Sequence, residues 1–337
     1  MTSDEATQPT REARSGAVAI VGRPNVGKST FLNAALAVEL AITSKTPQTT
    51  RTTLLGVVRR EVDGAPAEIR LLDTPGLHEF TDTALNRRMN LAARGASAEA
   101  DLVVLMVGVP SAAPSRSLAP HPADIAIAKE LEGPVLLVLN KIDRIKDKSR
   151  LLGLIEAWSK VRSFEAIVPV SALSDDGVGI VLDEIARRLP VAPHAFSEDD
   201  LTDRPLRYFA AEYVREQILR RAHEEVPHAT SVTIDVFEES AERAHISATI
   251  HVERLGQKKI VIGAGGSMLK QIGTEARRRI AELLGKPVHL ELFVRETPGW
   301  RDSPALLEEM GYAEVAEPRG AQRAPQKQKK SKPRRRS

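Results

Sequence analysis

Near its start the chain reads Gly22-Arg23-Pro24-Asn25-Val26-Gly27-Lys28-Ser29. This stretch matches the phosphate-loop pattern, in which a glycine and four residues are followed by Gly-Lys-Ser. An apolar run, 17–21, precedes it and a helical stretch, 30–36, follows it, which is the strand–loop–helix context that the pattern requires. Backbone N–H groups and the helix N-terminus then face phosphates, Lys28 reaches the terminal phosphates, and the Ser29 hydroxyl binds Mg²⁺. We therefore predict an α/β domain that holds a nucleoside triphosphate.

A second motif, Asp73-Thr74-Pro75-Gly76, directly follows the strand-like run 69–72. Strand ends form the ligand-binding edge of an open α/β sheet, so the Asp73 carboxylate is expected to hold Mg²⁺ through water. Gly76 is expected to offer its backbone N–H to the terminal phosphate. A chance glycine turn at 22–29 would not require this second motif, so we favour the nucleotide site.

Two further segments follow the next apolar runs and concern the base. Asn140-Lys141-Ile142-Asp143 ends the run 135–139, and Ser171-Ala172-Leu173 follows the run 166–170. Taken alone, the tripeptide carries no information. In this order and at this spacing, it supports the other motifs.

The chemistry of these segments selects guanine. The Asp143 carboxylate can accept both the N1 and the exocyclic amino protons of guanine, whereas adenine offers neither and would leave the charge unpaired. Lys141 can lay its stem on the purine face, Asn140 can bind the base while tying the loops together, and the Ala172 N–H can meet the guanine oxygen. We therefore predict GTP and GDP as ligands.

A second glycine loop, Gly263-Ala264-Gly265-Gly266, lies near the other end of the chain. A helix is expected at 205–223, strands at 231–238 and 244–253, a helix at 267–284 and a strand at 288–294. A Gly-x-x-Gly turn alone is a weak signal, but this setting resembles a bacterial-type KH domain. In such domains the turn lets the RNA backbone approach the protein closely.

Together these motifs resemble the translation-factor class of small GTPases, and within it the Era family. Thr46-Pro47-Gln48-Thr49-Thr50-Arg51 resembles the family's first switch, 201–205 its interdomain junction and 299–302 its closing segment. The resemblance covers roughly 15–314. It implies a P-loop GTPase domain with a mainly parallel sheet, followed by a smaller α+β KH-like domain of type II. The expected divisions are a disordered tail at 1–14, the GTPase domain at 15–189, a linker at 190–204, the KH-like domain at 205–314 and a disordered basic tail at 315–337.

The resemblance also assigns roles at the nucleotide site. It implies Lys28, Thr50 and Gly76 as catalytic residues and Ser29, Thr50 and Asp73 as the magnesium set, with Thr49 as the alternative to Thr50. Asn25 is similar to the residue that places K⁺ in related enzymes. The residues expected to contact the nucleotide are Gly22, Arg23, Pro24, Asn25, Val26, Gly27, Lys28, Ser29, Thr30, Asp73, Thr74, Pro75, Gly76, Asn140, Lys141, Asp143, Ser171, Ala172 and Leu173.

Slow intrinsic turnover is expected. Many relatives place Gln directly after Asp-x-x-Gly, but here Leu77 holds that position and cannot orient water. His78 follows as a candidate base, although a surface switch histidine is the simpler interpretation. We expect a rate on the order of 10⁻⁴ s⁻¹ without a partner or cation that completes the site.

On the KH-like side, the resemblance implies binding to the 3′ end region of 16S ribosomal RNA and a role in assembly of the small (30S) subunit. The residues themselves argue only for single-stranded RNA. Since Arg277, Arg278 and Arg279 must point in different directions around a helix, at least one of them is expected to be solvated. The residues expected to contact RNA are Lys258, Lys259, Gly263, Ala264, Gly265, Gly266, Lys270 and Arg277.

Composition sets the outer bounds. A chain of 337 residues suits two domains, and the absence of Cys excludes disulfides and cysteine metal sites. We find no run of about 18 apolar residues and no secretory leader, so a cytoplasmic protein is expected. We also expect a monomer. Residues 318–337 contain nine Lys or Arg and no acid, which leaves 39 basic against 45 acidic side chains in residues 1–317. The tail is expected to be either a solvated extension of low specificity or an electrostatic contact for RNA or for anionic lipid. We favour RNA, because the KH-like segment lies directly upstream.

Two other classes of function compete with the RNA switch. The chain could be a GTP-switched membrane-associated or cell-cycle factor with the basic tail as its anchor, peripheral on the inner face of the membrane. It could also be an ATP-dependent metabolic enzyme that uses the phosphate loop. The guanine-selective segment 140–143 argues against the second alternative.

Overall fold

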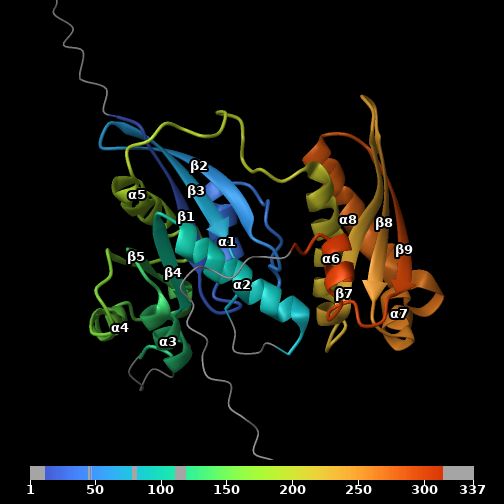
Figure 1. Cartoon of the computed structure of the whole chain (residues 1–337), viewed down its shortest axis with the longest axis horizontal. Coiled ribbons are helices and arrows are strands. Elements are labelled where there is room, and N and C mark those ends of the chain that lie inside the picture. Colours follow the sequence, from blue (N-terminus) through green and yellow to red (C-terminus); the bar gives the residue numbers. More distant parts are fainter. Residues whose placement is uncertain (1–11, 45, 47, 78–81, 111–118, 314–337) are drawn as a thin grey trace, which may run out of the picture.

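The computed structural model describes residues 12–44, 46, 48–77, 82–110 and 119–313. Two layered domains lie side by side (Figure 1). The N-terminal domain contains β1 (Arg14–Val21), α1 (Lys28–Leu36), β2 (Leu54–Val62), β3 (Ala65–Asp73), α2 (Ala84–Glu99), β4 (Leu102–Gly108), α3 (Pro122–Glu130), β5 (Val135–Asn140), α4 (Arg150–Ser159), β6 (Ile167–Pro169) and α5 (Val178–Arg188).

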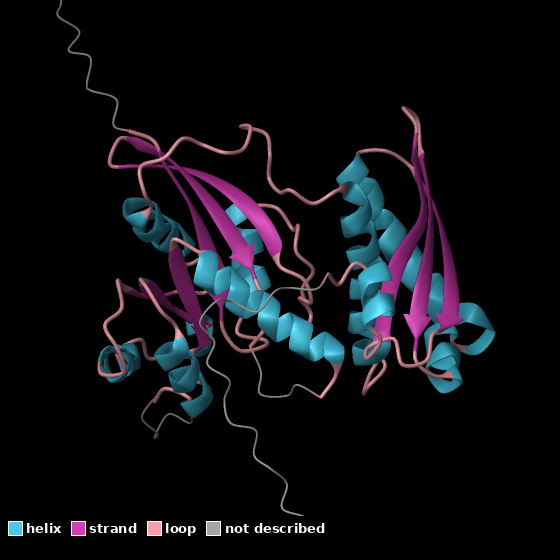
Figure 2. Ribbon diagram, in the orientation of Figure 1, coloured by secondary structure: helices cyan, strands magenta, loops and turns pink. Residues whose placement is uncertain are grey.

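The N-terminal domain is a six-stranded sheet covered on both faces. Its strand order is β2-β3-β1-β4-β5-β6, and every neighbouring pair is parallel except β2 with β3. Helices α1 and α5 pack on one face, and α2, α3 and α4 on the other (Figure 2). Strands buried on both faces read as continuous apolar runs, as β4 and β5 do. The carboxyl ends of β1, β3 and β5 therefore bring the three nucleotide motifs to one edge.

The C-terminal domain is a three-stranded sheet with helices on one face. Strand β8 pairs antiparallel with β7 and parallel with β9, and α6 and α8 pack against the inner face. Its elements are α6 (Leu206–Arg221), β7 (Thr230–Glu239), β8 (Ala244–Val252), α7 (Leu255–Ile262), α8 (Ser267–Leu284), β9 (Val288–Glu296) and α9 (Pro304–Glu309).

The two domains share apolar contacts. One buried cluster continues from Phe31 and Leu32 of α1 to Phe209 and Tyr213 of α6. A second cluster joins α2 to the closing segment through Leu85, Met89, Trp300, Leu307 and Tyr312. Helix α2 is the first helix after the Asp-x-x-Gly motif, and it packs against the C-terminal domain through Leu85 and Met89.

Several element boundaries differ from the sequence expectation. Helix α7 was not predicted; its end, Ile260-Val261-Ile262, is β-branched and has a low helix propensity. Pro205 is the N-cap of α6 and not its first helical residue. Strand β1 already begins at Arg14, which pairs with Val191. Among the described residues, no helix is both long and apolar enough to cross a bilayer.

Candidate functional site: the nucleotide loops and the glycine groove

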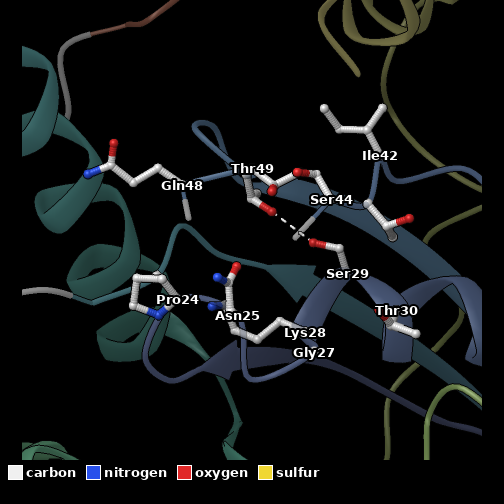
Figure 3. A pocket seen from close by; sticks show the side chains of 13 residues that line it. Pro24, Asn25, Gly27, Lys28, Ser29, Thr30, Ile42, Ser44, Gln48 and Thr49 are labelled. Carbon is white, nitrogen blue, oxygen red and sulfur yellow. Dashed lines mark hydrogen bonds between the residues drawn. The ribbon is translucent and has the colours of Figure 1, made fainter. Parts of the chain in front are cut away.

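The phosphate loop opens α1 and forms one wall of a pocket. Figure 3 shows Lys28 and Ser29 at the start of α1, with Gln48 and Thr49 of the first switch across the pocket. The Lys28 side chain is only 6% exposed, and its Nζ donates to the carbonyl oxygens of Gly22 at 3.2 Å and Arg23 at 3.3 Å. Burial lowers the pKa of Lys28 to about 8, against the opposing charge of Asp73.

The oxygen atoms of the Ser29, Thr50 and Asp73 side chains meet next to Lys28. Ser29 Oγ donates to Asp73 Oδ2 at 2.7 Å and lies 2.8 Å from Thr50 Oγ1, which itself donates to Asp73 Oδ2 at 3.1 Å. Thr49 instead bonds to the Thr46 carbonyl at 2.9 Å. The structure thus brings Ser29, Thr50 and Asp73 together and leaves Thr49 out.

These oxygens fit a magnesium ion. Burial raises the pKa of Asp73, while Lys28, Ser29 and Thr50 oppose that shift. Among the described residues, Asp73 Oδ1 is buried without a hydrogen-bond partner. A buried carboxylate oxygen without a donor is costly, and Mg²⁺ or its bound water would satisfy it.

Gly76 lies against the phosphate loop. A Cβ at this position would stand 2.7 Å from the Pro24 nitrogen, so no larger residue fits without displacing the loop. Leu77 donates its backbone N–H to the Gly22 carbonyl at 3.0 Å, and its side chain packs beside the apolar cluster of β4 and β5. Leu77 therefore stabilises the loop by its backbone. His78 lies outside the described residues.

The base-selecting segments converge through Asn140. Its Nδ2 donates to the Val26 carbonyl at 2.9 Å, and its Oδ1 accepts the backbone N–H groups of Lys141 at 2.8 Å and Ala172 at 3.0 Å. The Ala172 N–H that we assigned to the guanine oxygen thus has a protein acceptor. Asp143 Oδ1 accepts from Ser171 Oγ at 2.8 Å, which orients the carboxylate.

Some predicted nucleotide contacts have side chains that point elsewhere. Arg23 forms a bidentate ion pair with buried Asp124 of α3, at 2.6 and 2.9 Å, so its guanidinium is directed towards α3. Thr74 donates to the Ile20 carbonyl, and Leu173 is 82% exposed. Lys141 Nζ donates to the Asn25 carbonyl and so lies along the phosphate loop.

The second glycine loop borders a groove on the C-terminal domain. Gly266, Lys270 and Arg277 line it together with Leu290 and Leu292 of β9. Gly265 has a positive φ of 57°, and a Cβ there would meet nothing within 4 Å, so the turn faces open space. Lys258 and Lys259 lie on α7, and Gly263, the first residue of the glycine loop, is the C-cap of that helix.

The three consecutive arginines of α8 have three different environments. Arg277 faces the groove. Arg278 pairs with Glu275 and Glu282 on an exposed surface, at 3.4 and 2.6 Å. Arg279 stacks on Tyr213, 4.3 Å from the ring centroid, and pairs with buried Glu216. The structure therefore separates one groove residue, one solvated residue and one packing residue.

The first switch is held by the C-terminal domain, a role that we did not predict. Arg51 is 5% exposed and donates to the Thr230 carbonyl at 2.6 Å and the Pro227 carbonyl at 3.2 Å, and its guanidinium lies 5.7 Å from the centroid of the Trp300 ring. Arg215 of α6 donates to the Thr49 carbonyl. The motif Thr-Thr-Arg was visible in the sequence, but its partners lie some 180 residues away, so no local pattern could indicate them.

Comparison with known proteins agrees with this geometry. A family model described as 50S ribosome-binding GTPase matches residues 17–141, and a KH domain model matches residues 225–301. The GTPase Era of Xanthomonas oryzae pv. oryzae is 44% identical over 299 residues, covering 89% of this chain and 97% of the relative. That of Stenotrophomonas maltophilia is 42% identical over 297 residues, covering 88% and 97%.

Solved structures agree as well. Era in complex with MgGDPNP and nucleotides 1506–1542 of 16S ribosomal RNA matches with a TM-score of 0.83 and 36% identity, covering 89% of this chain and 99% of that one. A variant of Aquifex aeolicus Era bound to GDP and AlF₄⁻ matches equally. The predicted P-loop GTPase fold followed by a KH domain is confirmed, and the chain belongs to the Era family of GTPases.

Proposed function

We propose that this GTPase is a nucleotide-controlled switch that binds the 3′ end region of 16S ribosomal RNA during assembly of the small ribosomal subunit. Its relative of known structure is complexed with that RNA segment and a magnesium–nucleotide. The observation that carries the proposal is the anchoring of the first switch in the RNA-binding domain through Arg51 and Arg215. A movement of Thr50 toward a bound nucleotide would therefore change the contacts between the two domains.

At the nucleotide, this chain acts mainly by positioning and charge. Lys28 is expected to neutralise the terminal phosphates, with the loop N–H groups and the N–H of Gly76 as further donors. Ser29, Thr50 and Asp73 would hold Mg²⁺, which neutralises charge on the phosphate oxygens when bound. Asp143 would read guanine, and Asn140 would hold the two base loops against the phosphate loop. Leu77 cannot orient water, which supports slow turnover.

Potassium is part of the proposal. Asn25 lines the pocket beside Lys28 and adopts a positive φ of 60°. If Asn25 helps to place K⁺, replacing Na⁺ with K⁺ should raise the rate of GTP hydrolysis, and Asn25→Ser should remove that increase. An unchanged rate in K⁺ would contradict the assignment.

The RNA-binding role is tested with a labelled RNA from the 3′ end of 16S ribosomal RNA and protein loaded with GDP or a non-hydrolysable GTP analogue. Gly265→Asp adds a negative charge at the open turn. Gly153→Asp is the matched control, because it also faces open space but lies on α4 of the other domain. We expect tighter binding in the GTP-like state, lost in Gly265→Asp and kept in Gly153→Asp.

The basic tail, 318–337, lies outside the described residues, and its contribution to RNA binding is tested separately by deleting it. Weak binding that is equal in all states, and that falls only with salt or tail deletion, would identify a generic polycation and contradict the proposal. Sedimentation with anionic vesicles tests the alternative of a membrane anchor. That alternative predicts sedimentation that tail deletion abolishes.

A further inference from the structure

The outer face of the C-terminal sheet carries a cluster of histidine and glutamate side chains. Strand β9 alternates strictly: Leu290 and Leu292 face the helices, while His289 and Glu291 are exposed. Residues two apart on a strand share a face. His289 and Glu291 therefore lie next to each other on the side of the sheet away from the glycine groove, and neither contributes to the core.

The strand register adds two residues from the neighbouring strands. In the parallel pair of β8 and β9, His245 lies opposite His289, and in the antiparallel pair of β7 and β8 it lies opposite Glu238. The two imidazole ring centroids are 5.3 Å apart. The fold thus places two imidazoles and two carboxylates from three strands on one patch.

The distances within this patch match those around a metal ion. His245 Nε2 lies 3.3 Å from Glu291 Oε2, and His289 Nε2 lies 3.6 Å from Glu291 Oε1. One donor atom from each of the three residues can be chosen so that all lie within 4.8 Å of one another. In a tetrahedral zinc site with bonds of about 2.0–2.1 Å, neighbouring donors are about 3.3 Å apart.

We propose that His245, His289 and Glu291 form a binding site for a borderline divalent metal ion of the Zn²⁺ class, separate from the magnesium site of the nucleotide loops. Two imidazoles and one carboxylate are a donor set of zinc sites, and such ligands favour Zn²⁺ over Mg²⁺. Three protein donors on an exposed face leave a fourth position for water. The site joins β8 to β9.

Glu238 completes the arrangement as a positioning residue. His245 Nδ1 lies 3.9 Å from Glu238 Oε2, on the opposite side of the ring from Glu291. A carboxylate near the second ring nitrogen favours the tautomer in which Nε2 is the metal ligand.

The test is titration of full-length protein with Zn²⁺, after saturation with Mg²⁺ and GDP to fill the nucleotide site. We expect one equivalent bound with micromolar or tighter affinity by calorimetry, and a Co²⁺ complex whose visible absorption reports tetrahedral coordination. His245→Ala, His289→Ala and Glu291→Gln should each weaken binding by about tenfold or more. His194→Ala is the matched control, because it removes an exposed histidine far from the patch.

The substituted side chains are 41%, 67% and 46% exposed, so the variants should fold and bind GDP as the wild type does. Zn²⁺ should raise the midpoint of thermal unfolding of the wild type and not of the three variants, because it binds the folded site. Failure of one-equivalent binding, or equal binding by all variants, would refute the site. Neither result bears on the nucleotide-controlled RNA switch.

Discussion

At the residue scale, two adjacent side chains of the first switch point in opposite directions. Thr50 faces Ser29 and Asp73, whereas Arg51 enters the C-terminal domain. The sequence predicted that the hydroxyl of Thr50 or Thr49 binds Mg²⁺. It could not decide between the two, since neighbouring threonines are equivalent in a sequence pattern. In the structure the Thr49 hydroxyl donates to the Thr46 carbonyl within its own turn, which favours Thr50.

We expect Thr50→Ala to lose its Mg²⁺-dependent preference for GTP over GDP by about tenfold, or about 1.4 kcal/mol, since it removes the hydroxyl that we propose as a magnesium ligand. Thr49→Ala, which alters only a local turn, should keep the preference. The measurement is competition between GTP and GDP for a fluorescent nucleotide, with and without Mg²⁺. The reverse pattern would assign the ligand to Thr49.

At the element scale, β3 and α8 each carry side chains that contact several different parts of the molecule. Glu68 of β3 is fully buried and accepts from Ser15, from Arg59, and from the backbone of Ala195 and Phe196 after α5. Helix α8 presents its arginines to three environments. The helical pattern predicted that they would diverge, but which one faces the groove depends on β9.

Glu68→Gln should lower the free energy of unfolding at pH 7 by about 2 kcal/mol, because charge-assisted hydrogen bonds are lost. Burial acts to raise the pKa of Glu68, but these donors together hold it below its ordinary value. The Glu68 carboxylate therefore stabilises the fold fully at a pH above its pKa in the unfolded chain. This stabilisation is lost as the pH falls through its pKa in the folded protein. Urea denaturation should show the difference from the wild type shrinking below about pH 4.

On α8, Arg277→Ala should weaken RNA binding and reduce the slope of log affinity against log salt by about one, since one phosphate contact is removed. Arg278→Ala also removes one positive charge, but Arg278 forms only exposed ion pairs. The RNA affinity of this variant should stay near that of the wild type. Fluorescence anisotropy over a salt series measures both. Equal losses in the two variants would indicate nonspecific electrostatics.

At the scale of the whole molecule, the interface joins the first switch and helix α2 to the C-terminal domain. Local motifs predicted each site, because phosphate loops, base-selecting segments and glycine turns are contiguous in sequence. The interface was unpredicted, because Arg51, Arg88 and Arg215 bond to backbone carbonyls, which no residue pattern identifies. Helix α7 was also missed, since its packing against the sheet outweighs the β-branched residues at its end.

Arg51→Met should uncouple the two domains. It removes the guanidinium, which donates hydrogen bonds to three backbone carbonyl groups within residues 227–230. The ratio of RNA affinities in the GTP-like and GDP states should fall toward one, while GDP affinity is kept. Arg207→Met is the control, since this exposed arginine bonds to Ile234 within its own domain. A ratio unchanged in Arg51→Met would exclude the residue from the coupling.

The Arg51 contact also has a consequence for synthesis of the protein. Its partner Tyr312 lies 261 positions further along the chain. Domains fold in order as the chain leaves the ribosome, so the N-terminal domain can fold while the contacts of Arg51 have not yet been made. We therefore expect a stage of synthesis at which the nucleotide loops have formed but the first switch has no docking site, and the full set of Arg51 contacts forms only once Tyr312 has been added.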